Sequence, residues 1–118
     1  MATVQRFEDL DIWKESKDLS LSIYKNFRNL KDFGFRDQIC RAAISVMNNI
    51  AEGFERDSDK EFQRFLKISK GSAGEVRSML RIALDLGYVE KKEFENLIPK
   101  CITLSSKLSR FIKYLNKN

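Results

Sequence analysis

Basic residues recur at helical steps in the second half of this 118-residue chain. One run begins at Lys60 and another at Lys107, and within each run the next cation follows after three, four or seven residues. Each run would therefore form a row along a helix. Such rows neutralise phosphate groups without reading base sequence. The candidate nucleic-acid-binding residues are Lys60, Arg64, Lys67, Lys70, Arg77, Arg81, Lys107, Arg110, Lys113 and Lys117.

The charge of the chain is unevenly distributed. Residues 1–59 hold nine Lys/Arg and eleven Asp/Glu, whereas residues 60–118 hold thirteen and six, and no acidic residue follows Glu95. The second half therefore favours a polyanion, which could be RNA, DNA or an acidic partner protein. The alternative is an ordinary solvated helix face.

Residues suited to catalysis are scarce. The chain has no histidine, the commonest general base and metal ligand. Glu52, Asp57 and Asp59 cluster near a predicted helix end, but acids near a loop are usually just solvated. The glycines of residues 71–74 lack the lysine of a phosphate-binding loop. We expect no enzymatic activity, no metal and no cofactor.

Apolar residues at three- and four-residue spacing predict four helices, over about residues 9–30, 36–55, 59–86 and 91–115. Ser58 and Glu61 fit a capping box at the start of the third helix, and Gly87 fits a left-handed cap at its end. Pro99 predicts a kink or a break in the fourth helix. No stretch shows sustained two-residue alternation, so we expect almost no strand.

Short connections between these helices predict an all-α fold, an antiparallel up-down-up-down four-helix bundle that forms one domain over residues 1–118. No apolar run approaches the ~20 residues that span a bilayer, and the start lacks a signal peptide. We expect no membrane partner. Two isolated cysteines, Cys40 and Cys101, indicate buried thiols and a cytoplasmic location.

The second predicted helix is unusually decorated. It carries two adjacent apolar stripes, the second made of Cys40, Ile44, Met47 and Ala51. Together they form an apolar face wider than a single neighbouring helix would cover. Beside them runs a polar ladder with a glycine: Gln38, Arg41, Ser45, Asn49, Glu52 and Gly53. The ladder is either an ordinary solvent-exposed face or a contact with another helix or another subunit. In the second case Asn49 and Glu52 bind neighbours, and Gly53 permits close backbone approach.

Several short segments carry a family resemblance. They are Asn49-Ile-Ala-Glu-Gly53, Gly71-Ser72, Leu86-Gly87-Tyr88 and the opening Phe7-Glu-Asp-Leu-Asp-Ile-Trp13. With these segments the chain resembles the bacterial "four helix bundle protein" family. Its members include proteins encoded in intervening sequences of 23S rRNA genes, often labelled S23 ribosomal proteins. Arg77 departs from that pattern, because the family often has an acidic residue there.

The resemblance implies a homo-oligomer, commonly a pentamer, with no known enzymatic activity and a suspected role with RNA. A related branch, the accessory protein of diversity-generating retroelements, is a basic pentamer that binds nucleic acid. We therefore expect an oligomeric bundle that binds RNA or DNA through its basic helix faces. The alternative is a protein-interaction scaffold that binds an acidic partner protein.

Overall fold

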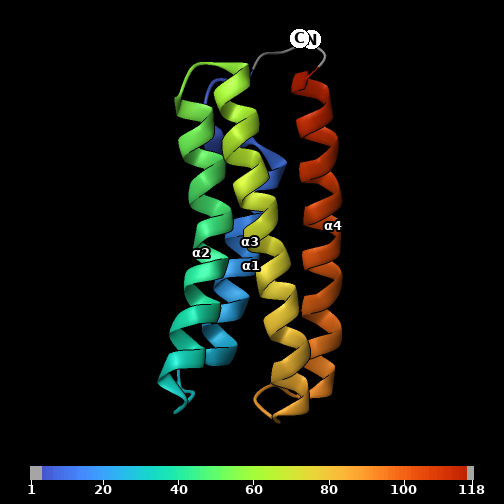
Figure 1. Ribbon diagram of the computed structural model, residues 1–118. Helices are drawn as coiled ribbons and strands as arrows, with labels where there is room; N and C mark the ends of the chain where they lie inside the picture. Colours follow the sequence, from blue (N-terminus) through green and yellow to red (C-terminus); the bar gives the residue numbers. More distant parts are fainter. Residues whose placement is uncertain (1–3, 117–118) are drawn as a thin grey trace.

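The computed structural model describes residues 4–116, which form a four-helix bundle (Figure 1). Consecutive helices run in opposite directions in the figure, and no strand occurs within residues 4–116. Each helix packs on the next one, and the first also packs on the fourth. The elements are the 3-10 turn η1 (Phe7–Asp9) and the helices α1 (Asp11–Phe27), α2 (Phe33–Glu55), α3 (Asp59–Asp85) and α4 (Lys91–Asn116).

The predicted all-helical fold is confirmed, but the first connection lies elsewhere than expected. Helix α1 ends at Phe27 rather than near Leu30, and α2 begins at Phe33 rather than near Arg36. The early start of α2 comes from Asp32, whose side chain accepts a hydrogen bond from the Phe35 amide at 3.2 Å. This N-cap satisfies an amide that the first turn would otherwise leave unpaired.

The signals at both ends of α3 are confirmed in part. The Ser58 hydroxyl accepts from the Glu61 amide at 3.3 Å, but the Glu61 side chain turns away to Arg64, so only half of the capping box forms. Gly87 has a positive φ of 75° and closes the helix, with its amide donating to the Leu84 carbonyl at 3.1 Å. This left-handed cap is the one predicted.

Pro99 does not break α4, which runs without interruption from Lys91 to Asn116. Both Pro99 and Glu95 are exposed. The Glu95 carbonyl that loses its helical partner therefore lies on the solvent side, where water can bind it. The predicted break is wrong because the proline lies on the outer face of the helix.

All four helices supply the core. The largest side chains that are fully buried are Leu19, Ile23, Phe27, Ile39, Val46, Ile50, Leu66, Val76, Leu80, Leu97, Leu104 and Leu108. Two buried serines connect helices through backbone carbonyls. Ser20 donates to the Ala43 carbonyl at 3.1 Å, and Ser69 donates to the Val46 carbonyl at 2.7 Å. These bonds satisfy polar groups in an apolar interior and pin α2 between α1 and α3.

Two loops at one end of the bundle are joined through a tyrosine. The Tyr88 hydroxyl, after α3, donates to Asp32 at the start of α2 at 2.7 Å. This hydrogen bond is the main cause of a pKa of Asp32 below its ordinary value, and the hydrogen bond from the Phe35 amide lowers that pKa further. It also raises the pKa of Tyr88. Both shifts favour the neutral phenol bound to the carboxylate.

Changing Tyr88→Phe is therefore expected to lower stability at neutral pH and to make it less sensitive to acid. Because the pKa of Asp32 is lowered in the folded state, the bond stabilises the fold above about pH 4. Its contribution is lost as pH falls through that lowered pKa. Urea unfolding at pH 7 and pH 3 measures the free energy of unfolding of both proteins. The difference between the wild type and Tyr88→Phe should be smaller at pH 3 than at pH 7. Tyr24→Phe, at an exposed tyrosine, is the control.

No helix within residues 4–116 combines the length and apolar character needed to cross a membrane.

Candidate nucleic-acid interface

Five of the candidate cations lie on the outward side of α3, next to α4, and all five are exposed. They form two parallel lines with seven-residue spacing, Lys60, Lys67 and Arg81 in one and Lys70 and Arg77 in the other. At 100° per residue both lines turn away from the side of α3 that faces α2. That opposite side is fixed by the Ser72 hydroxyl, which lies 2.8 Å from the Ser45 hydroxyl of α2.

Two observations connect these lines to α4. Burial raises the pKa of the Cys101 thiol in α4 to about 11, and the positive charge of nearby Arg77 counteracts part of that rise. Arg77 therefore lies at the α3–α4 seam. On α4, Lys113 and Ser106 are exposed and seven residues apart, so they lie on one line along the outer side of that helix. We call the six exposed cations on this side the basic face: Lys60, Lys67, Lys70, Arg77, Arg81 and Lys113.

Acidic side chains are absent from the basic face between Lys60 and Arg81. Of the two acids of α3 in that interval, Glu61 is bound by Arg64 of the same helix, and Glu75 accepts from Gln38 of α2. Helix α4 has no acid after Glu95. Within residues 4–116, none of the six cations makes an ion pair. Their charges are therefore available to an external anion.

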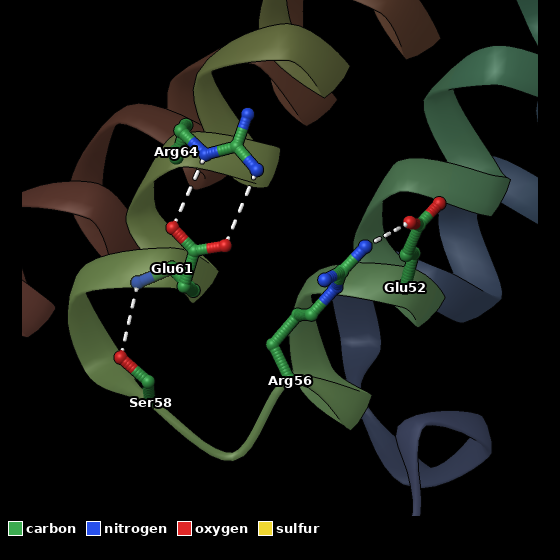
Figure 2. A network of polar contacts seen from close by, with 5 residues as sticks. All are labelled: Glu52, Arg56, Ser58, Glu61 and Arg64. Atoms are coloured by element: carbon green, nitrogen blue, oxygen red, sulfur yellow. Dashed lines mark hydrogen bonds and ion pairs between the residues drawn. The ribbon is translucent and has the colours of Figure 1, made fainter.

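The structure places the other predicted cations differently. Arg64 is engaged by Glu61, with both guanidinium–carboxylate distances at 3.2 Å (Figure 2). Lys107 pairs with Glu15 of α1. Arg110 is exposed and lines a hollow at the end of α4, and Lys117 lies outside the described residues.

Lys107 therefore serves as a clamp between α1 and α4, together with Lys100, which lies 2.6 Å from Asp18. The sequence alone did not reveal this role, because the paired residues are far apart in the chain. The change Lys107→Gln is expected to cost up to about 1 kcal/mol of stability, as half-exposed ion pairs do. It should alter nucleic-acid affinity by less than about twofold, whereas Lys113→Gln should lower it severalfold. Fluorescence anisotropy titrations of labelled nucleic acid with each variant compare the two affinities.

Part of the polar ladder of α2 lies at the contact with α3 of the same chain. Gln38 binds Glu75, and the Ser45 hydroxyl meets Ser72. The predicted bonds of Asn49 and Glu52 to neighbouring helices do not occur in residues 4–116, because Asn49 donates to Ser45 within α2 and Glu52 binds Arg56 at the C-terminal end of the same helix. The partners on α3, Ser72 and Glu75, could not be identified from the sequence.

Gly53 is the tightest point of that contact. An added Cβ would lie 2.7 Å from the Phe65 Cβ and 3.0 Å from the Phe62 Cδ1. Gly53 thus permits the close approach of α2 and α3 that the sequence suggested. Gly71 and Gly74 behave differently, since a Cβ at either position would have no atom within 4 Å.

Beyond Gly53, two arginines, Arg56 and Arg64, lie at the corner between α2 and α3 (Figure 2) and flank one aromatic ring. Arg56 and Arg64 lie 5.0 and 4.7 Å from the Phe65 ring centre. Each also binds a carboxylate of its own helix, Glu52 at 2.8 Å for Arg56 and Glu61 for Arg64. The hydrogen bond from Arg64 lowers the pKa of Glu61. These two cations stabilise the corner and are not part of the basic face.

Arg41 and the second apolar stripe of α2 are both partly accessible to solvent. Arg41 is exposed and, with Tyr24 and Ile44, lines a hollow of about 520 Å³ between α1 and α2. Cys40 is buried, whereas Ile44, Met47 and Ala51 are only half-buried. The stripe is therefore partly covered by the chain itself. Within residues 4–116 no group of three His, Cys, Asp or Glu side chains could hold a metal ion.

Comparison with known proteins points to one family. The model of the family described as 23S rRNA-intervening sequence protein matches residues 8–110. The crystal structure of a protein of unknown function from the S23 ribosomal protein family of Bacteroides thetaiotaomicron VPI-5482 is similar, with a TM-score of 0.80 and 24% sequence identity. The match covers 86% of this chain and 98% of that one. At this identity the likeness supports the fold, and no curated protein matches.

Proposed function

Because this chain belongs to the 23S rRNA-intervening sequence protein family, we propose that it is a non-enzymatic homo-oligomer that binds nucleic acid, RNA first of all, through its basic face. The observation that carries the proposal is the set of six exposed cations, with no acid on that side of α3 between Lys60 and Arg81. A row of cations without base-reading side chains suits phosphate contacts, which supply affinity independent of sequence.

Self-association is the second part of the proposal. Several large apolar side chains are exposed, among them Leu21 at 63% and Ile82 and Leu86 at 51%. Ile44 and Met47 of the second stripe are half-covered. Burying such groups against further copies would be favourable. The family resemblance suggests a pentamer, which would carry about +25 and bind through several faces at once.

A cytoplasmic location belongs to the same proposal. Its support is that Cys40 and Cys101 are both free, buried thiols. Free thiols persist where the surroundings are reducing.

A salt titration tests nucleic-acid binding. We expect micromolar affinity for unrelated RNA or DNA at ~50 mM salt, falling steeply and linearly with log salt. Absence of binding at that salt concentration would refute the proposal and favour the scaffold that binds an acidic protein. Light scattering of the free protein tests the other part, because a single copy at high concentration would refute self-association.

A further inference from the structure

We infer that the basic face binds double-helical nucleic acid by its sugar–phosphate backbone, in preference to a single strand. This inference rests on the proposed function and narrows its ligand class. It follows from four properties of the face, namely its lack of aromatic side chains, its length, the size of the residues between the cations, and its charge.

The basic face offers no aromatic platform. The aromatic residues exposed in residues 4–116 are Tyr24 on α1, Phe33 at the start of α2, and Tyr114 on α4. Tyr114 packs edge-on against Phe111, with ring centres 6.1 Å apart, and both line the hollow at the end of α4. Proteins that bind single strands without sequence preference gain much of their affinity from bases stacked on such rings. A single strand would lose that contribution here.

The length of the face suits a duplex. Lys60 and Arg81 are 21 residues apart on one unbroken helix, which spans about 32 Å at 1.5 Å per residue. One turn of B-form DNA is about 34 Å long. Helix α4 lies alongside α3 (Figure 1), and its Lys113 is exposed to solvent. The cations are therefore held in fixed positions over roughly one helical turn.

Small residues occupy the space between the cations. Gly74 lies on the line from Lys67 to Arg81 and has open space where a side chain would be. Ser78 is exposed on α3, and Ser106 is exposed on α4. The short side chains at these positions leave room for a wide, rigid ligand, and serine hydroxyls can donate to phosphate oxygens.

Charge density points the same way. A duplex carries one negative charge per about 1.7 Å of its axis, so each contact releases more condensed counterion than on a single strand. Affinity that comes almost entirely from phosphate contacts is therefore greater for the duplex. The corresponding salt slopes are about −0.9 and −0.7 for each neutralised phosphate.

The test compares four labelled probes of equal length by fluorescence anisotropy: a 24-base-pair RNA duplex, the equivalent DNA duplex, oligo(U) and oligo(dT). The protein is used at full length and the salt is varied. We expect both duplexes to bind about tenfold more tightly than either single strand at 100 mM salt. Equal or tighter binding of the single strands would overturn the inference and leave the proposed function intact. No binding of any probe would refute the proposed function itself.

A paired variant ties the preference to the face. Lys67→Gln with Arg81→Gln should lower duplex affinity strongly and reduce the salt slope by about two. The control, Lys14→Gln with Lys25→Gln, removes the same charge from exposed positions of α1 and should change the slope little. If the control reduces duplex binding as much as the face variant does, the assignment of the duplex to this face is wrong.

Discussion

Replacing Gly53 with alanine is expected to destabilise the protein by about 2 kcal/mol and to lower Tm by roughly 8 °C. The new methyl group would lie 2.7 Å from the Phe65 Cβ, a distance that real Cβ contacts do not reach. Since a Cβ is fixed to the backbone, the strain cannot be relieved by rotating a side chain. Helices α2 and α3 must move apart, which would lengthen the polar contacts of the ladder as well. Thermal and urea unfolding followed by circular dichroism measure the loss.

The matched control is Gly71→Ala on α3. Gly71 is exposed, and a Cβ there meets nothing within 4 Å. Alanine is about 1 kcal/mol better than glycine in a helix interior, so this variant should be stabilised. Equal stability of Gly53→Ala and Gly71→Ala would contradict the close contact of α2 and α3 at Gly53.

Removing four charges from the basic face is expected to lower nucleic-acid affinity by about 10²–10³-fold at 100 mM salt. The variant changes Lys67, Lys70, Arg77 and Arg81 to glutamine, which is also a good helix former. All four side chains are exposed and outside the ion pairs of the described residues. The fold should therefore be retained while the phosphate contacts are lost. The salt slope should fall by up to about four.

A second variant separates this local effect from net charge. It carries glutamine at four exposed cations on the α1 side, namely Lys14, Lys25, Arg28 and Lys31. Both variants lower the net charge from +5 to +1, so they weaken the long-range attraction equally. Only the first should lose most of its affinity. Equal losses would mean that binding follows overall charge rather than the basic face.

The parts of the fold that sequence could predict are those with local signals. Ser58 and Gly87 mark the ends of α3, and the structure places the ends of α3 and α4 within one residue of prediction. Helix α2 begins before the predicted residue 36 because the Asp32 side chain caps it. Of the kink or break predicted at Pro99, the break does not occur, and the sequence did not show that this residue lies on the solvent side.

The candidate interface was predictable to the extent that spacing determines a helix face. The short steps between cations predicted a row along one helix, and Lys60, Lys67 and Arg81 of that row are exposed on α3. Arg64 could have been set aside, because Glu61 stands three residues before it, a spacing that favours an ion pair. The pairing of Lys107 with Glu15 joins residues on two different helices, and no pattern within one helix reveals it.

The most direct test of the basic face is lysine footprinting. The protein is acylated briefly, with and without a 24-base-pair RNA duplex, and the modification at each lysine is measured by mass spectrometry. The account predicts severalfold protection of Lys60, Lys67, Lys70 and Lys113. It predicts little change at Lys14, Lys25 and Lys31, which are also exposed, on the α1 side. Uniform protection, or protection confined to the α1 lysines, would contradict it.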